Sequence, residues 1–276
     1  MATSTEGWLS PTLSDGLGNR LFQLAAATTA ADKYKKQLVL FLPRCYKASH
    51  SSADEIPKLF PQIPIIETDS AQWHEIPEKS FATYEPFPPL PLTATQNIVL
   101  RGWRQSPLYI PYKGFTPNWE SALGASELRR IEGLIQEPTS AAFLHVRLGD
   151  YRILPHHFVN LEGYWLQCLH SLQDEGLVKR IYVFSDETEY TETNLVPFFR
   201  TVAPNLEFHI IRETSALAAL YAMSLVGGGA ICANSTYSWW GAYFSAARSA
   251  GKKIYMPAKW GDFDTKDLYP IWATRV

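Results

Sequence analysis

Short apolar runs and segments of helical period alternate along the second half of the chain. The apolar runs, each bounded by turn residues, predict strands at 141–146, 181–184, 206–211, 230–233 and 253–256. The segments between them carry apolar residues every three to four positions and predict helices at 161–172, 187–199, 215–226 and 236–250. Strands that are apolar throughout are typical of a parallel sheet covered on both faces. The second half therefore predicts βαβ units, with Pro197 weakening the end of one helix.

The first half of the chain is less regular. An alanine-rich apolar face predicts a helix over 21–37, whose lysine-rich end suits the negative pole of the helix dipole. Apolar runs predict strands at 39–42, 63–66 and 98–100, joined by long, proline-containing connections. Apolar periodicity thins out over 112–125, and we place a domain boundary there. The expected organisation is two α/β domains, residues 1–118 and 119–276, with a ligand site in the cleft between them.

Composition narrows the class of protein. The 276 residues are 46% hydrophobic and carry a formal net charge of −2. The high apolar content excludes a disordered chain. The nearly balanced charge gives no excess of basic residues for binding nucleic acid or an anionic membrane. Three cysteines cannot form a closed disulfide framework, and their spacing matches no zinc site. Because no apolar run is long enough to span a bilayer and the start lacks a signal-peptide pattern, we expect a soluble, cytoplasmic protein.

Polar residues follow the predicted strands of the second half at their carboxyl ends, which is where parallel sheets bind ligands. These residues are Arg147 and Asp150, Ser185 and Asp186, Arg212, and the run Asn234, Ser235 and Thr236. Arg147 offers a planar, permanently charged fork that matches phosphate oxygens. An ion pair with Asp150 explains the same arginine equally well.

The helix that starts near Thr236 has two interpretations. Its first turn offers unpaired N–H groups and a partial positive charge, which suit a phosphate. Plain N-capping by Asn234 or Ser235 is the simpler explanation. Trp239, in the same helix, is compatible with packing against the sheet as a core aromatic residue. His145 lies inside a strand, which favours a buried, hydrogen-bonded histidine.

Gly16, Gly18 and Asn19 precede the first predicted helix, and glycine lets a backbone approach a ligand closely. The pattern alone is weak, because Pro11 argues against a strand before it. The chain has neither a dinucleotide fingerprint nor a P-loop.

Two further pairs of residues are of types that bind metals or transfer protons in other proteins. Asp262 and Asp264 form a DxD near the C-terminus, and we interpret it as a solvated loop rather than a metal site. His156 and His157 lie in a loop a few residues after Arg147, and only that closeness makes them of interest.

Five segments occur in one order along the chain: DGLGNRLFQLAAA at 15–27, RGWRQSPLY at 101–109, HVRLGDY at 145–151, YVFSDE at 182–187 and ANSTYSWWGAYFS at 233–245. Together they resemble the α-1,2-fucosyltransferase family (glycosyltransferase family 11-like). The resemblance implies a GT-B-like fold, with two Rossmann-type halves facing a central cleft, the first on the acceptor side and the second binding the donor. It also implies GDP-fucose as donor substrate, a galactose-containing oligosaccharide as acceptor, inversion at the anomeric carbon, and no metal or other cofactor.

The resemblance also implies roles for individual residues. It puts the donor diphosphate on Arg147 and on the turn of Asn234, Ser235 and Thr236, and the guanine on Asp186. The other donor-site residues that it implies are Gly16, Gly18, Asn19, Arg20, His145, Ser185 and Trp239. Two positions depart from the family: Leu148 stands where a second arginine is common, and Arg20 where glutamine is common.

The expected mechanism follows from charge. GDP leaves readily once its negative charge is neutralised, and Arg147 with the helix start supplies preorganised donors for that purpose. The acceptor hydroxyl loses its proton late in the attack, to a carboxylate or an imidazole. Asp150 is the first candidate for this base and His157 the second, while Asp150 as a residue that orients Arg147 is the alternative.

Three other functions compete with this interpretation. One is another GDP-sugar transferase, for example an enzyme that transfers fucose to a protein hydroxyl. Another is a GDP-sugar- or glycan-binding protein without catalysis, which Leu148 motivates. The third is a dehydrogenase, which the missing fingerprint disfavours. The sequence identifies neither the acceptor nor the oligomeric state.

Overall fold

The computed structural model describes residues 7–45, 54–67, 72–89, 96–212 and 215–276, so the first six residues, where no signal peptide is expected, lie outside them. The chain divides into two units. Unit 1 runs to Ala122 and includes Asp264–Pro270, and unit 2 comprises Leu123–Phe263 and Ile271–Val276. The expected boundary at 118/119 lies four residues before the observed one. A single boundary cannot describe the return of Asp264–Pro270 to unit 1.

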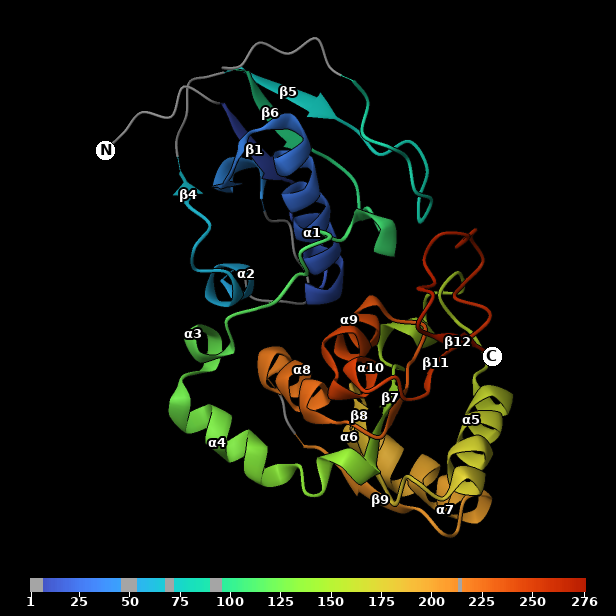
Figure 1. The fold of residues 1–276 in the computed structure, drawn as a ribbon. Helices are drawn as coiled ribbons and strands as arrows, with labels where there is room; N and C mark the ends of the chain where they lie inside the picture. Colours follow the sequence, from blue (N-terminus) through green and yellow to red (C-terminus); the bar gives the residue numbers. More distant parts are fainter. Residues whose placement is uncertain (1–6, 46–53, 68–71, 90–95, 213–214) are drawn as a thin grey trace. The chain divides into compact units, whose positions relative to one another are not determined.

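Unit 1 is built on a small parallel sheet. Its elements are β1 (Trp8–Pro11), α1 (Leu17–Tyr34), β2 (Gln37–Leu38), β3 (Leu40–Phe41), α2 (Glu55–Leu59), β4 (Ile65–Ile66), β5 (Trp73–Ile76), β6 (Asn97–Leu100) and α3 (Trp119–Leu123), with short 3-10 turns at Leu42–Arg44 and Pro107–Tyr109. The strand order is β2-β1-β6-β5, and β3 pairs separately with β4. Helix α1 lies alongside β1 and β6 (Figure 1), and its alanines pack on Leu9 and Ile98.

A strand does precede the glycines of the first motif, so the expectation that Pro11 excludes one was wrong. Pro11 is the last residue of β1 and lies beyond the pairing of β1 with β2, which ends at Leu9. β1 sits between β2 and β6, and the next residue, Thr12, donates its N–H to Leu100 O at 2.9 Å. β5 was missed as well, because its residues Trp73–Ile76 are only half buried and form no apolar run.

Unit 2 follows the predicted alternation of strands and helices. Its elements are α4 (Ala125–Leu134), β7 (Ala141–Val146), α5 (Glu162–Glu175), β8 (Arg180–Ser185), α6 (Thr188–Tyr190), α7 (Val196–Val202), β9 (Glu207–Ile210), α8 (Ala216–Leu225), β10 (Gly229–Ile231), α9 (Thr236–Phe244), α10 (Ala246–Ser249), β11 (Ile254–Met256) and β12 (Thr274–Arg275), with 3-10 turns at Pro138–Ser140 and Asp150–Arg152. The sheet is parallel throughout, in the order β12-β11-β10-β7-β8-β9. The α/β class with parallel sheets is therefore confirmed.

Helices cover both faces of the unit 2 sheet, as continuously apolar strands require. Alternate residues of β7 (Ala142, Leu144 and Val146) pack with α5 and α7 in one core. The other residues of the strand face α8 and α9, and the His145 ring lies 5.6 Å from that of Tyr237 in α9. Figure 1 shows α5 and α7 on one side of this sheet and α8 and α9 on the other. Because side chains alternate along a strand, His145 and Arg147 share the α9 side.

Two predicted helices are divided. The helix expected over 187–199 consists of α6, a π-helical segment at Thr191–Leu195 and α7. Pro197 is the second residue of α7 and directly follows the π-helical segment, so it coincides with the irregular part of this helical stretch. The helix expected over 236–250 breaks at Ser245, whose hydroxyl caps α10 by accepting from Ala247 N and donates to Val226 O.

In the part of the chain that the structure describes, no helix has the length and apolar character needed to cross a membrane.

Candidate functional site

The unit 2 sheet has a topological switch point between β7 and β10. The connection after β7 leads through α5 to β8, while the connection after β10 leads through α9 to β11, on the opposite side. In open parallel sheets, ligands bind beyond the carboxyl ends of the two strands at such a point. Arg147 follows β7, and Asn234, Ser235 and Thr236 follow β10, so topology puts both predicted diphosphate-binding groups at this edge.

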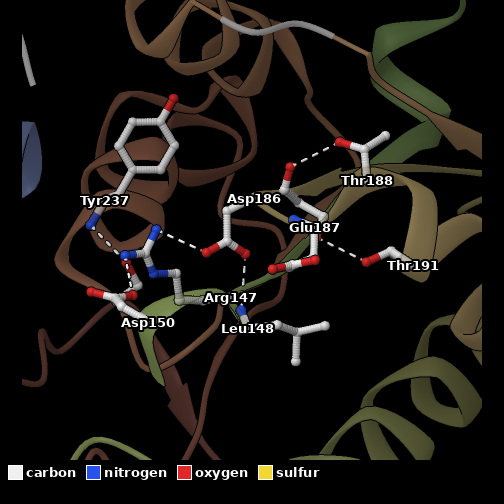
Figure 2. A network of polar contacts seen from close by, with 10 residues as sticks. Arg147, Leu148, Asp150, Asp186, Glu187, Thr188, Thr191 and Tyr237 are labelled. Carbon is white, nitrogen blue, oxygen red and sulfur yellow. Dashed lines mark hydrogen bonds and ion pairs between the residues drawn. The ribbon is translucent and has the colours of Figure 1, made fainter. Parts of the chain in front are cut away.

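Arg147 lies between two carboxylates. Its Nη2 is 2.5 Å from Asp150 Oδ1, and its Nη1 is 3.0 Å from Asp186 Oδ2. The side chain is 28% exposed, so it reaches the surface. Figure 2 shows the guanidinium pointing toward both carboxylates, in one polar network with Tyr237 of α9. The ion pair that the sequence offered as an alternative is thus present, with a second carboxylate that sequence spacing did not indicate.

Asp186 also shapes the turn after β7. Its Oδ1 accepts a hydrogen bond from Leu148 N at 2.9 Å. A Cβ at Gly149 would lie 2.6 Å from Asp186 Oδ2, so glycine makes room for the carboxylate. Asp186 therefore positions Arg147 and the backbone of the turn together. The predicted contact of Asp186 with guanine stays a prediction.

A row of rings extends from Arg147. The guanidinium lies 5.1 Å from the centroid of the Tyr151 ring, which stacks on His157 at 5.1 Å. His157 in turn meets Phe263 edge-on at 5.6 Å. Burial raises the pKa of Tyr151 to about 12, although Arg147 acts against the shift. Tyr151 is therefore a neutral phenol at physiological pH. Its ring stacks on His157 and so keeps the imidazole near the carboxyl edge of the unit 2 sheet.

The start of α9 is capped as the simpler interpretation expected. Ser235 Oγ accepts from Tyr237 N at 3.3 Å. The buried Asn234 donates through Nδ2 to His157 O and to Trp260 O, each at 2.9 Å. Asn234 thereby ties the loop of His157 to the helix start. Thr236 is partly exposed at the first position of the helix, whose N–H groups point out of its N-terminus.

His145 is buried, as expected, and carries no charge. It lies beneath Arg147 on β7, but the expected hydrogen bond is not found at its Nδ1, which has no partner among the described residues. Burial lowers the pKa of His145 to about 3, with a smaller contribution from the positive charge of Arg147. The residue therefore presents a neutral imidazole below the guanidinium.

This low pKa makes stability depend on pH. Between about 3 and 6.5, the unfolded chain binds a proton at this histidine that the folded chain does not. The contribution of His145 to the free energy of unfolding is thus complete above pH 6.5 and declines as the pH falls toward 3. Urea unfolding at pH 7 and pH 5 should show a smaller loss of stability for His145→Gln than for the wild type. Equal losses in the two proteins would contradict the assignment.

The other donor-site predictions in unit 2 fall on residues with structural contacts. Ser185 Oγ accepts from Glu187 N at 3.0 Å and from Thr191 Oγ1 at 2.8 Å, which fixes the loop that carries Asp186 (Figure 2). Trp239 is fully buried and packs on Trp240 and Trp272. Trp239 is therefore a core aromatic residue, as the sequence suggested.

Gly16, Gly18, Asn19 and Arg20 lie at the start of α1 in unit 1. Gly16 is the N-cap, and its carbonyl accepts from the N–H groups of Asn19 and Arg20. Asn19 Oδ1 accepts from Gln105 Nε2 at 3.0 Å. The side chain of Arg20 is 0% exposed and lies 3.8 Å from a carboxylate oxygen of Glu55. Contact of Arg20 with a ligand would require this guanidinium to leave the interior of unit 1.

The DxD is a surface loop, as expected. Asp262 pairs with Lys259 at 2.7 Å, and this lysine lowers the pKa of the Asp262 carboxyl. Asp264 Oδ1 accepts from the backbone N–H of Lys266 at 3.0 Å. Over the described ranges, no group of three or more His, Cys, Asp or Glu side chains is arranged to hold a metal ion.

The sequence analysis gave no role to two features of the structure. Tyr151 received no role, although the structure puts its ring between Arg147 and His157. The loop at 101–106 also received none, although it joins the start of α1 through the Gln105–Asn19 hydrogen bond. The loop directly follows the predicted strand 98–100, so the rule that ligands bind at carboxyl ends of strands would have selected it.

Comparison with known proteins gives one partial sequence match. The O-antigen biosynthesis glycosyltransferase WbnK of Escherichia coli is 28% identical to this chain over 141 residues, which are 49% of this chain and 44% of WbnK. The match thus spans less than half of that relative. No family model matches the chain.

Solved structures match over most of the chain. Arabidopsis thaliana FUT1, a variant in complex with GDP, has a TM-score of 0.55 and 13% identity, over 90% of this chain and 70% of that one. The fucosyltransferase NodZ from Bradyrhizobium has a TM-score of 0.51 and 12% identity, over 87% and 93%. POFUT1 in complex with GDP-fucose has a TM-score of 0.51 and 11% identity, over 89% and 97%. The chain is thus similar in part of its sequence to a glycosyltransferase, and it has the α/β, GT-B-like fold of these fucosyltransferase structures.

Proposed function

We propose that this protein is an inverting fucosyltransferase that moves L-fucose from GDP-fucose to the 2-hydroxyl of a galactose-ended glycan. One observation carries the proposal: Arg147 and the start of α9 follow the two strands at the switch point of the unit 2 sheet. Similarity to a glycosyltransferase and to fucosyltransferase structures supports the reaction class. The linkage and the acceptor come from the family resemblance of the sequence motifs.

In the proposed reaction, Arg147 and α9 stabilise the leaving group. The bond between fucose C1 and the β-phosphate oxygen breaks, and its electron pair stays on GDP. The guanidinium has five N–H donors, and the contacts to Asp150 and Asp186 do not use all of them. In the proposed complex the remaining donors bind the phosphates. The N-terminus of α9 adds N–H groups and the positive end of its dipole. Donors fixed in place before the reaction stabilise the developing charge most effectively.

Asp150 is the proposed base. The acceptor oxygen bonds to fucose C1 from the face opposite GDP, and its proton passes to a carboxylate oxygen of Asp150. The Arg147–Asp150 contact of 2.5 Å uses Oδ1 of this carboxylate, so Oδ2 is the oxygen proposed to take the proton. His157, held by Tyr151, is the second candidate. Gly16, Gly18 and Asn19 remain predicted donor contacts, whereas the buried Arg20 and Trp239 are left out of the proposed site.

Binding and product analysis test the proposal together. GDP should raise the melting temperature of the protein in EDTA as much as in Mn²⁺, because Arg147 and α9 supply the positive charge. Mass spectrometry after incubation with GDP-fucose and a panel of β-galactosides should show addition of one fucose, and linkage analysis should place it at O2. A requirement for Mn²⁺ that Asp262→Ala abolishes would instead assign the metal role to the DxD.

A second candidate is a GDP-sugar-binding protein without catalysis. The observation that favours it is Leu148, an apolar residue next to Arg147 in the turn after β7. Such a protein would bind GDP-fucose but release no GDP with any acceptor.

If fucose were transferred to a folded protein domain and to none of the β-galactosides, the enzyme would be a protein O-fucosyltransferase.

A further inference from the structure

Three loops meet at the carboxyl edge of the unit 1 sheet. Glu78 follows β5, residues 101–106 follow β6, and residues 12–16 follow β1. Backbone hydrogen bonds tie them together, from Glu78 N to Arg101 O at 3.0 Å and from Thr12 N to Leu100 O at 2.9 Å. This edge belongs to unit 1 alone, and the proposed mechanism gives no role to its 101–106 loop.

The 101–106 loop has a strained shape that its surroundings fix. Gly102 has φ of +107° and Arg104 has φ of +53°. The Glu78 carboxylate accepts from Trp103 N and from Arg104 N, each at 2.8 Å. A Cβ at Gly102 would lie 2.2 Å from Glu78 Cβ, so glycine alone fits there. Backbone strain of this kind persists only where neighbours enforce it, and it clusters at ligand sites.

Arg104 secures the loop from below. Its side chain is buried, and it donates to Ile76 O at 3.1 Å and to Arg101 O at 3.2 Å. The ends of β5 and β6 are thus joined by a guanidinium that never reaches solvent. A loop held at so many points has little freedom, and of its two exposed residues, Arg101 and Trp103, the aromatic one is Trp103.

Trp103 is exposed and fixed at the same time. The residue is 41% exposed, although large aromatic side chains are usually well buried. Its indole N–H donates to Asp15 Oδ2 at 2.5 Å, and its ring meets Phe81 edge-on at 5.5 Å. Asp15 itself has φ of +63° in the first sequence motif. Two distant motifs therefore cooperate to present one rigid indole face to solvent.

We propose that Trp103 is a stacking platform for a neutral pyranose of the acceptor glycan, and that Asp15 is the positioning residue that orients its indole. A pyranose has a face of C–H groups that packs on a flat aromatic ring, and a rigid ring binds at little cost in conformational entropy. The Asp15 carboxylate beside the indole favours hydroxyl groups and disfavours an anion such as the nucleotide. This inference rests on the proposed function, because it names the binding surface for the acceptor.

The direct test uses binding, without turnover. The full chain labelled with ¹⁵N-tryptophan is titrated with methyl β-D-galactopyranoside, and the indole N–H signal of Trp103 is assigned by its absence in Trp103→Phe. The signal should shift saturably, in the presence and absence of GDP. Absence of a shift up to the solubility limit of the glycoside would overturn the proposal.

Kinetics with variants then separate the role of the ring from a structural one. Trp103→Ala should raise KM for a β-galactoside at least tenfold while KM for GDP-fucose stays unchanged, and Trp103→Phe should raise it less. Asp15→Ala should behave like Trp103→Ala, whereas Asp15→Asn, which retains an oxygen acceptor, should restore most of the affinity. Tyr112→Ala, which removes a fully exposed aromatic ring of unit 1, is the matched control and should leave both constants unchanged.

The outcomes distinguish this inference from the proposed function. If fucose is transferred to β-galactosides but Trp103→Ala has wild-type KM for the acceptor, the platform is wrong and the enzyme assignment stands. If no β-galactoside accepts fucose while the glycoside still shifts the Trp103 signal, the sugar platform stands and the proposed reaction fails.

Discussion

Arg147→Ala should lower turnover by about 10²–10³-fold, the usual cost of removing one preorganised donor to a developing negative charge. The guanidinium lies at the switch point of the sheet, within ion-pair distance of two carboxylates. Without it, the site would hold two carboxylates next to the departing diphosphate and no cation between them. The fold should persist, because the side chain is partly exposed and its ring contact is with Tyr151 in the loop after β7. Turnover, GDP affinity and melting temperature together measure the effect.

Two variants sharpen this prediction. Arg147→Lys keeps the charge but loses the planar fork, and should fall between the wild type and Arg147→Ala. Arg152→Ala removes an exposed arginine five residues further on, whose guanidinium lies 4.2 Å from the Tyr190 ring centroid, and should retain turnover. Wild-type turnover in Arg147→Ala, with the protein folded, would remove the basis of the proposed mechanism.

Asp150→Asn should separate binding from chemistry. Loss of a general base lowers turnover by about 10²–10⁴-fold. GDP affinity should rise at the same time, because two carboxylates against one guanidinium leave the cluster negative and oppose an incoming diphosphate. A variant that binds GDP more tightly and transfers fucose far more slowly is therefore the expected result. Calorimetric titration with GDP and the initial rate of GDP release provide the two readouts.

Asp186→Asn is the matched control for Asp150→Asn. It neutralises the other carboxylate beside Arg147 and keeps an oxygen that accepts from Leu148 N. It should retain much more turnover than Asp150→Asn at saturating GDP-fucose, while loss of the predicted guanine contact should weaken GDP binding. If both variants lose turnover equally, Asp150 orients Arg147 and is not the base. His157→Gln then becomes the decisive variant, since His157 is the second candidate.

Much of unit 2 could be predicted from its sequence. The strand at 141–146 was predicted with its observed limits, and α8 lies within the helix predicted over 215–226, whose first residue, Ser215, is the observed N-cap. Such elements follow from residues within a few positions of one another, because helical and strand periodicity are local properties. Unit 1 was harder, since β1 ends in a proline and β5 is only half buried. Their strand identity depends on pairing with β6, which is distant in sequence.

The residue types of the candidate site were determined by the sequence, because the carboxyl ends of predicted parallel strands select Arg147, Asp186 and the turn at Asn234. Their partners were decided by tertiary structure. Arg147 meets Asp186 because β7 and β8 are neighbours, and Trp103 meets Asp15 because β6 lies beside β1. Burial separated Arg20 from the exposed groups in the same way. Strand order and solvent exposure arise from contacts between residues tens of positions apart, which a local pattern of polar and apolar residues does not encode.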